Sequence, residues 1–142
     1  MKKIIYFLAL GLCIACDEKK PIEISPDDLH GSIDQVTDIM IHDIFSPPVA
    51  SRIFTYPNIA AYEIIALGNP EYKSLAGQLE GLTPIPVPGS ENTVNPELAA
   101  LIAHMELSKK LIFSEDRMEK FQDSLYGKWR ALNETEFEAS KS

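Results

Sequence analysis

The most apolar stretch in the interior of the sequence decides the fold, and it reads SPPVASRIFTYPNIAAYEIIALG over residues 46–68. Ser46 and the two prolines after it stop a preceding helix and start a new one, because proline lacks the amide hydrogen that an earlier turn would need. We therefore expect a helix over 49–67, with a kink or short break at Pro57. Residues 59–67 are apolar on nearly all sides of that helix, which predicts burial between neighbouring elements.

A second helix is predicted directly before this stretch. Ser25 is followed by Pro26, Asp27 and Asp28, an arrangement that favours a helix start through the cap, the proline and the acidic first turn. One apolar stripe then runs along the predicted helix at steps of three and four residues, through Leu29, Ile33, Val36, Met40 and Ile44. The sequence predicts a helix over 26–44.

The second half of the chain also contains residues that favour helix starts. Asn95-Pro96-Glu97 predicts the start of a helix over 96–113, and Ser114 the start of one over 114–131. Residues 133–136 read NETE, a capping box that opens one more helix. Between these halves, residues 70–93 contain proline at 84, 86 and 88 and form a long loop. With no convincing strand pattern, we expect an all-α fold, a fragment of a helical bundle.

The charge of the chain excludes nucleic acid as a partner. Its 142 residues include 13 Lys and Arg against 21 Asp and Glu, a net charge of −8. Removing Lys2 and Lys3 with the leader leaves 11 basic against 21 acidic residues, a net charge of −10. Such a surface cannot release counterions from a nucleic acid. The two cysteines, Cys13 and Cys16, lie in or beside that leader, so the rest of the chain holds no disulfide.

The first residues are typical of an export signal. Lys2 and Lys3 precede an apolar or small run from Ile4 to Ala15, which is too short to span a bilayer. Residues 1–15 are therefore predicted to be a signal peptide. The Ala15-Cys16 junction resembles the lipobox of bacterial lipoproteins, which implies lipidation of Cys16, a flexible linker over 16–25 and attachment to the membrane of the cell envelope. The alternative is a plain secretory signal with a free Cys16.

Few residues suggest chemistry. His30 with Asp34, and Asp38 with His42, are spaced as possible metal-ligand pairs, but two ligands make an incomplete site, so we expect no metal. His104 faces away from the apolar stripe and is predicted to lie on the surface. Two further expectations concern charged and aromatic side chains. Glu63 and Arg52 are interpreted as structural ion-pair partners, with each other or with another helix, and Phe121, Tyr126 and Trp129 as core residues.

The block HDIFSPPVASRIF at residues 42–54, continued by YPNIAAYE at 56–63, resembles the N-terminal signature of vanadium-dependent haloperoxidase-related proteins of the type 2 phosphatidic acid phosphatase superfamily. This resemblance spans roughly residues 25–142. It implies a helical bundle enzyme that binds phosphate or vanadate through a Lys and Arg pair, a Ser-Gly-His segment and a final Arg with a His. None of those motifs occurs here, so residues 26–142 resemble only the N-terminal region, with the catalytic part absent.

Two hypotheses follow. In the first, the chain is the N-terminal fragment of an exported phosphatase or haloperoxidase-like enzyme, inactive alone, without a catalytic residue of its own. Its vanadate or phosphate site and its missing C-terminal helices would then lie in the absent part. The scattered positions of Arg52, Arg117 and Arg130 agree with this, because an oxyanion needs clustered cations. In the alternative, the chain is a self-standing helical envelope lipoprotein that acts as a binding or interaction module.

Overall fold

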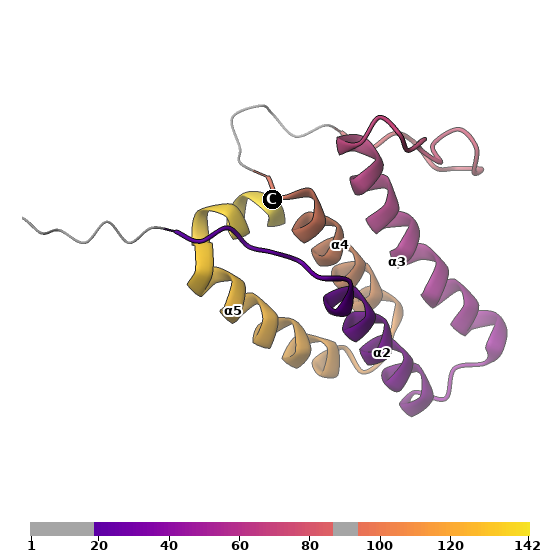
Figure 1. The fold of residues 1–142 in the computed structure, drawn as a ribbon. Coiled ribbons are helices and arrows are strands. Elements are labelled where there is room, and N and C mark those ends of the chain that lie inside the picture. The colour runs from indigo at the N-terminus through magenta and orange to yellow at the C-terminus, as the bar shows by residue number, and fades with distance from the viewer. Residues whose placement is uncertain (1–18, 87–93) are drawn as a thin grey trace, which may run out of the picture.

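The computed structural model describes residues 19–86 and 94–142, and these residues form an all-α fold (Figure 1). Its helices are α2 (Pro26–His42), α3 (Pro47–Gly68), α4 (Pro96–Leu111) and α5 (Glu115–Lys141). The predicted fold class is therefore confirmed, and three of the four helices begin at the predicted prolines. Among the described residues, no helix combines the length and the apolar character that crossing a membrane requires.

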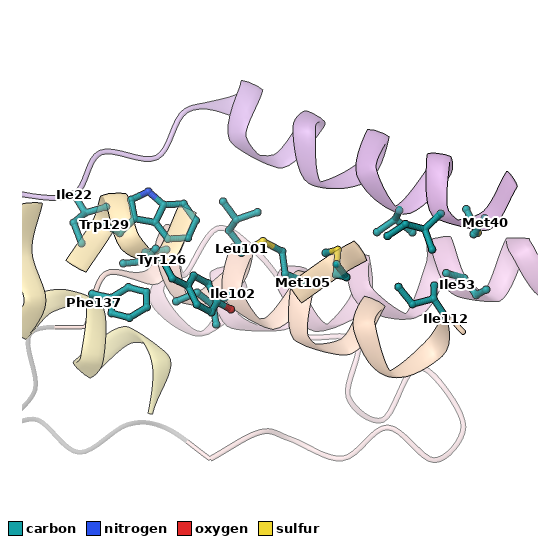
Figure 2. Packing of buried hydrophobic residues seen from close by; sticks show 14 residues of the cluster. Ile22, Met40, Ile53, Leu101, Ile102, Met105, Ile112, Tyr126, Trp129 and Phe137 are labelled. Carbon is teal, nitrogen blue, oxygen red and sulfur yellow. The ribbon is translucent and has the colours of Figure 1, made fainter. Parts of the chain in front are cut away.

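Helix α4 is the central element, since it packs against α2, α3 and α5. The buried side chains follow its length: Trp129, Tyr126 and Phe137 gather at one end, and Met40, Ile53 and Ile112 at the other (Figure 2). The core cluster comprises Ile22, Val36, Ile39, Met40, Ile53, Leu98, Leu101, Ile102, Met105, Ile112, Met118, Tyr126, Trp129 and Phe137. Trp129 and Tyr126 are thus core residues as predicted, and Phe121 packs against the cluster while only partly buried.

Helix α2 ends at His42, two residues before the predicted end. The backbone of Ile44 is left-handed, with φ of 56°. The amides of Ile44 and Phe45 donate to the carbonyls of Ile41 and Met40 at 3.3 and 3.2 Å. These two bonds define a Schellman motif, in which the left-handed position is usually glycine. The side chain of Ile44 is 88% exposed, so the prediction that it belongs to the buried stripe is wrong.

Helix α3 differs from its prediction in two respects. A kink or short break was expected at Pro57, and the helix runs through this buried proline from Pro47 to Gly68 without a break. A proline removes one hydrogen bond of the ladder, and the packing of α3 along α4 holds the remaining turns in place. Residues 59–67 are mostly half-buried, and Leu67 is exposed. The expected burial between neighbours is wrong within the described chain, because α3 lies at the flank of the bundle (Figure 1).

The predicted capping box at residues 133–136 forms in part, because Asn133 caps the helix but donates to Glu136 at 3.0 Å through its side-chain amide and not through its backbone amide. Asn133 leaves helical geometry, with φ of −158° and ψ of 90°, and bends α5 into two parts. Its side-chain oxygen accepts a hydrogen bond from the amide of Glu136 at 3.2 Å. The second part continues to Lys141 and buries Phe137, which packs beside Tyr126 with ring centroids 5.2 Å apart.

Residues 19–25 pack on the bundle and do not form the free linker that the sequence suggested. Ile22 is 3% exposed. Its amide donates to Glu136 at 3.1 Å, and its carbonyl accepts from the side chain of Asn95 at 2.8 Å. The boundary of the folded part therefore lies before residue 25. The signal peptide over 1–15 and the lipidation at Cys16 fall outside the described residues.

Candidate functional site

A buried serine and histidine pair joins α2 to α4. The Oγ atom of Ser32 lies 2.9 Å from Nδ1 of His104, and the two residues are 0% and 2% exposed. The predicted surface position of His104 is wrong, because α4 is covered on several sides and even the residues off its apolar stripe face a neighbouring helix. Burial lowers the pKa of His104 to about 4, so its imidazole is neutral at pH 7.

This pair does not make a nucleophilic site. A serine nucleophile needs access to its substrate and a base that a third group orients, whereas Ser32 is completely buried. One turn after His104, Ser108 is also buried, and its hydroxyl has no hydrogen-bond partner among the described residues. The Ser32–His104 contact therefore joins α2 to α4, and the burial of all three polar side chains leaves no access for a substrate.

Glu63 attaches the loop after α3 to that helix. It is 3% exposed and accepts hydrogen bonds from the Ser74 hydroxyl at 2.5 Å and the Leu75 amide at 2.6 Å. The Tyr62 hydroxyl adds a bond to the carbonyl of Lys73 at 2.9 Å. The predicted ion pair of Glu63 is wrong, because hydrogen-bond donors of the loop take the place of a cation. Arg52 is exposed and forms no salt bridge within residues 19–86 and 94–142.

A third polar contact joins the turn that follows α2 to the turn between α4 and α5, at one end of the bundle. Asp43 accepts hydrogen bonds from the amides of Phe113 and Ser114, each at 3.0 Å, and from the Ser114 hydroxyl at 2.5 Å. Desolvation raises the pKa of Asp43, but these bonds outweigh it and lower the pKa overall. Sequence reasoning missed this contact, because the partners lie about 70 residues apart in the chain and only the fold brings them together.

The residues of the two possible metal-ligand pairs, His30 with Asp34 and Asp38 with His42, are all exposed on α2. His30 lies 3.9 Å from Asp27 and both side chains are exposed, while His42 is exposed on the last turn of α2. Within the described ranges, no three His, Cys, Asp or Glu side chains gather into a group that could hold a metal ion.

The cations of the described chain do not fit a vanadate or phosphate group either. Such an oxyanion is stabilised by several positive groups that converge on it. Arg130 is already bound to Glu138 at 3.0 Å. Arg117 is exposed in the first turn of α5, next to two acidic residues, and Arg52 belongs to α3. His104, the one buried histidine of this part, is neutral and bound to Ser32.

Two hollows in the described part of the chain lie along α3, and a third, of about 390 Å³, lies at the bend of α5 beside Lys19, Lys20 and Arg130. A groove of about 870 Å³ runs between α3, α4 and the loop, and a second of about 550 Å³ lies between α3, α4 and the start of α2. Mostly apolar side chains of α3 line both of them. The larger groove, called groove A below, is lined by Thr55, Tyr56, Ile59, Ala60, Glu63, Ile64, Leu79, Glu80, Gly81, Leu82, Ile85, Ala103 and Leu107.

Comparison with known proteins gives one informative relationship. No family model and no curated protein matches the chain. Among solved structures, the chain is similar to the protein of "Crystal structure of the first bacterial vanadium dependant iodoperoxidase", with 64% sequence identity and a TM-score of 0.86. The match covers 87% of this chain and 30% of that chain. The chain therefore has the structure of a fragment of a vanadium haloperoxidase-like fold, as its resemblance predicted.

Proposed function

We propose that this chain is the N-terminal helical part of an exported vanadium haloperoxidase-like enzyme of the type 2 phosphatidic acid phosphatase superfamily. The observation that carries the proposal is the 64% identity to an iodoperoxidase over 87% of this chain. That relationship favours halide oxidation over phosphate ester hydrolysis as the activity of the complete enzyme. The leader and Cys16 support export and a lipid anchor in the cell envelope.

In this proposal the chain has a structural role in the enzyme. Bound vanadate would supply the centre that activates peroxide, and its ligands would come from the part of the fold that this chain does not represent. Arg130 lies beside Lys19 and Lys20 in one hollow, but Glu138 binds its guanidinium group, Lys19 donates to Thr135, and Glu134 lines the same hollow, which leaves these cations poorly suited to an oxyanion. The net charge of −8 also opposes capture of an anion by this chain alone.

The test is a chimera in which the described residues of this chain replace the matching segment of the bacterial iodoperoxidase. We expect a folded chimera that oxidises iodide with vanadate and peroxide within about tenfold of the parent, which is about 1.4 kcal/mol in activation free energy. A chimera that fails to fold, or that folds and has lost iodide oxidation, would contradict the proposal.

The purified full chain should show no turnover of bromide or iodide with peroxide and vanadate, and none of p-nitrophenyl phosphate. The matched control is Arg52→Ala, which removes one of the two arginines, Arg52 and Arg117, that form no salt bridge in the described part of the chain. Turnover by the wild-type chain above that control would show that the chain carries a catalytic site of its own.

A further inference from the structure

The composition of α3 does not match its surroundings. Most of its 22 residues are apolar, yet its buried residues are only Ile53, Pro57 and Glu63. In contrast, α4 buries Leu98, Ala100, Leu101, Ile102, His104, Met105 and Ser108 among its 16 residues. A helix that is apolar on nearly all sides belongs in an interior. The exposed flank of α3 therefore needs a further element to cover it.

From this mismatch we infer that groove A is the docking site for an apolar helix supplied by the remaining part of the haloperoxidase-like fold. The inference rests on the proposed function and names the surface through which this chain would join the rest of the enzyme. The side chains of Tyr56, Ile59, Ala60 and Ile64 recur at helical spacing along one side of the groove, Ala103 and Leu107 of α4 form a second side, and Leu79, Leu82 and Ile85 of the loop complete the lining. Two such rows form a groove that accepts the ridge of a third helix.

The relationship to the iodoperoxidase identifies the occupant. This chain corresponds to 30% of that chain, so 70% of the related protein has no counterpart here. At a TM-score of 0.86 the two backbones agree closely, so a surface left open in this chain is available to that remaining part. In groove A the side chains of Tyr56 on α3 and Leu79 on the loop are 46% and 41% exposed, and such a helix would cover this apolar area.

A lipid bilayer fits this surface less well. The expected anchor precedes Lys19, whose ammonium group donates to Thr135 of α5 at 2.7 Å. The N-terminal segment thus leaves the bundle beside α5, while α3 lies on the opposite flank (Figure 1). The exposed Glu80 also lines groove A, and its negative charge disfavours contact with anionic headgroups.

The test measures, by mass spectrometry of the peptide that carries the introduced residue and not Cys13 or Cys16, how fast N-ethylmaleimide labels cysteines placed in groove A. Tyr56→Cys and Ile64→Cys are prepared in the full chain and in the iodoperoxidase chimera, with Leu132→Cys on α5 as a matched control outside the groove. Leu132 is 38% exposed, close to the exposure of the groove side chains. We expect labelling at positions 56 and 64 to be at least tenfold slower in the chimera than in the full chain, with a smaller change at position 132.

Equal labelling rates at positions 56 and 64 in both proteins would overturn the inference and leave the proposed function intact. Protection in the full chain alone, together with a dimer in light scattering, would also overturn it, because a second copy would then be the occupant. An unfolded or inactive wild-type chimera would instead contradict the proposed function, and with it this inference. A slow rate at 56 and 64 in a folded, active chimera supports both.

Discussion

The buried imidazole of His104 should make the stability of the chain depend on pH. Burial lowers its pKa from 6.5 to about 4, so the unfolded chain binds a proton at a higher pH than the folded chain does. A group whose pKa is lower in the folded than in the unfolded chain stabilises the fold fully above its unfolded pKa of 6.5. This stabilisation is lost as the pH falls towards the folded pKa of about 4. Acidification therefore favours unfolding, because the protonated ring would be buried between α2 and α4 next to Ser32.

The magnitude follows from the two pKa values. They differ by roughly 2.5 pH units, and each unit corresponds to about 1.4 kcal/mol. The free energy of unfolding should thus fall by about 3 kcal/mol between pH 7 and pH 4 through His104 alone. For a domain that is stable by about 5–15 kcal/mol, this loss is a large fraction of the total.

Urea denaturation of the wild type and of His104→Gln between pH 7 and pH 4 measures this contribution. Glutamine retains a polar partner for Ser32 and does not titrate, so the carboxylates that both proteins share cancel in the difference. We expect the wild type to lose its advantage over the variant by about 1.4 kcal/mol per pH unit below pH 6. A difference in unfolding free energy that stays constant across this range would refute the reasoning.

Three further outcomes are expected. Ile44→Asn should raise the free energy of unfolding by about 0.5–1 kcal/mol in urea titrations, because asparagine tolerates the left-handed backbone of the Schellman motif better than a β-branched residue, and an unchanged or lower value would contradict the strain. Glu63→Ala should speed tryptic cleavage after Lys73, because Ser74 and Leu75 lose their acceptor at a cost of about 1–3 kcal/mol, whereas Glu63→Gln, which keeps one acceptor, should be cleaved more slowly than Glu63→Ala. Mass spectrometry of the exported protein should find an acylated N-terminal peptide that begins at Cys16, and an intact Met1 or an unacylated peptide would contradict lipidation.

The helix starts could be predicted because their causes are local. Ser25-Pro26, Ser46-Pro47 and Asn95-Pro96 each place a cap before a proline, and each begins a helix. The bend at Asn133 was also predictable, because its capping box uses atoms only three residues apart. Local hydrogen bonding and the fixed φ of proline are encoded within a few residues, so the sequence suffices for these features.

The polar contacts could not be predicted, because their partners are distant in sequence. Ser32 and His104 are 72 residues apart, and periodicity alone placed His104 on the surface. Burial of Ile22 depends in the same way on Asn95 and Glu136, two residues from other elements. Glu63 was correctly expected to need a partner, but the pattern gave no reason to prefer loop donors to a cation. Periodicity shows which residues are apolar, and only the packing shows which faces of a helix are covered.

Helix α3 has features of both kinds: its ends are set by local sequence, and its burial is set by packing. Its boundaries are local and were predicted within two residues, whereas its burial was predicted from an apolar surface that extends nearly around the helix. Within this chain only one side of α3 packs on α4, so the prediction and the structure disagree over residues 59–67. If the rest of a haloperoxidase-like fold covers groove A, Ile59, Ala60 and Ile64 become interior, and this side of α3 then agrees with its environment. The apolar composition of this exposed side of α3 is then explained by contact with the 70% of the related enzyme that has no counterpart in this chain.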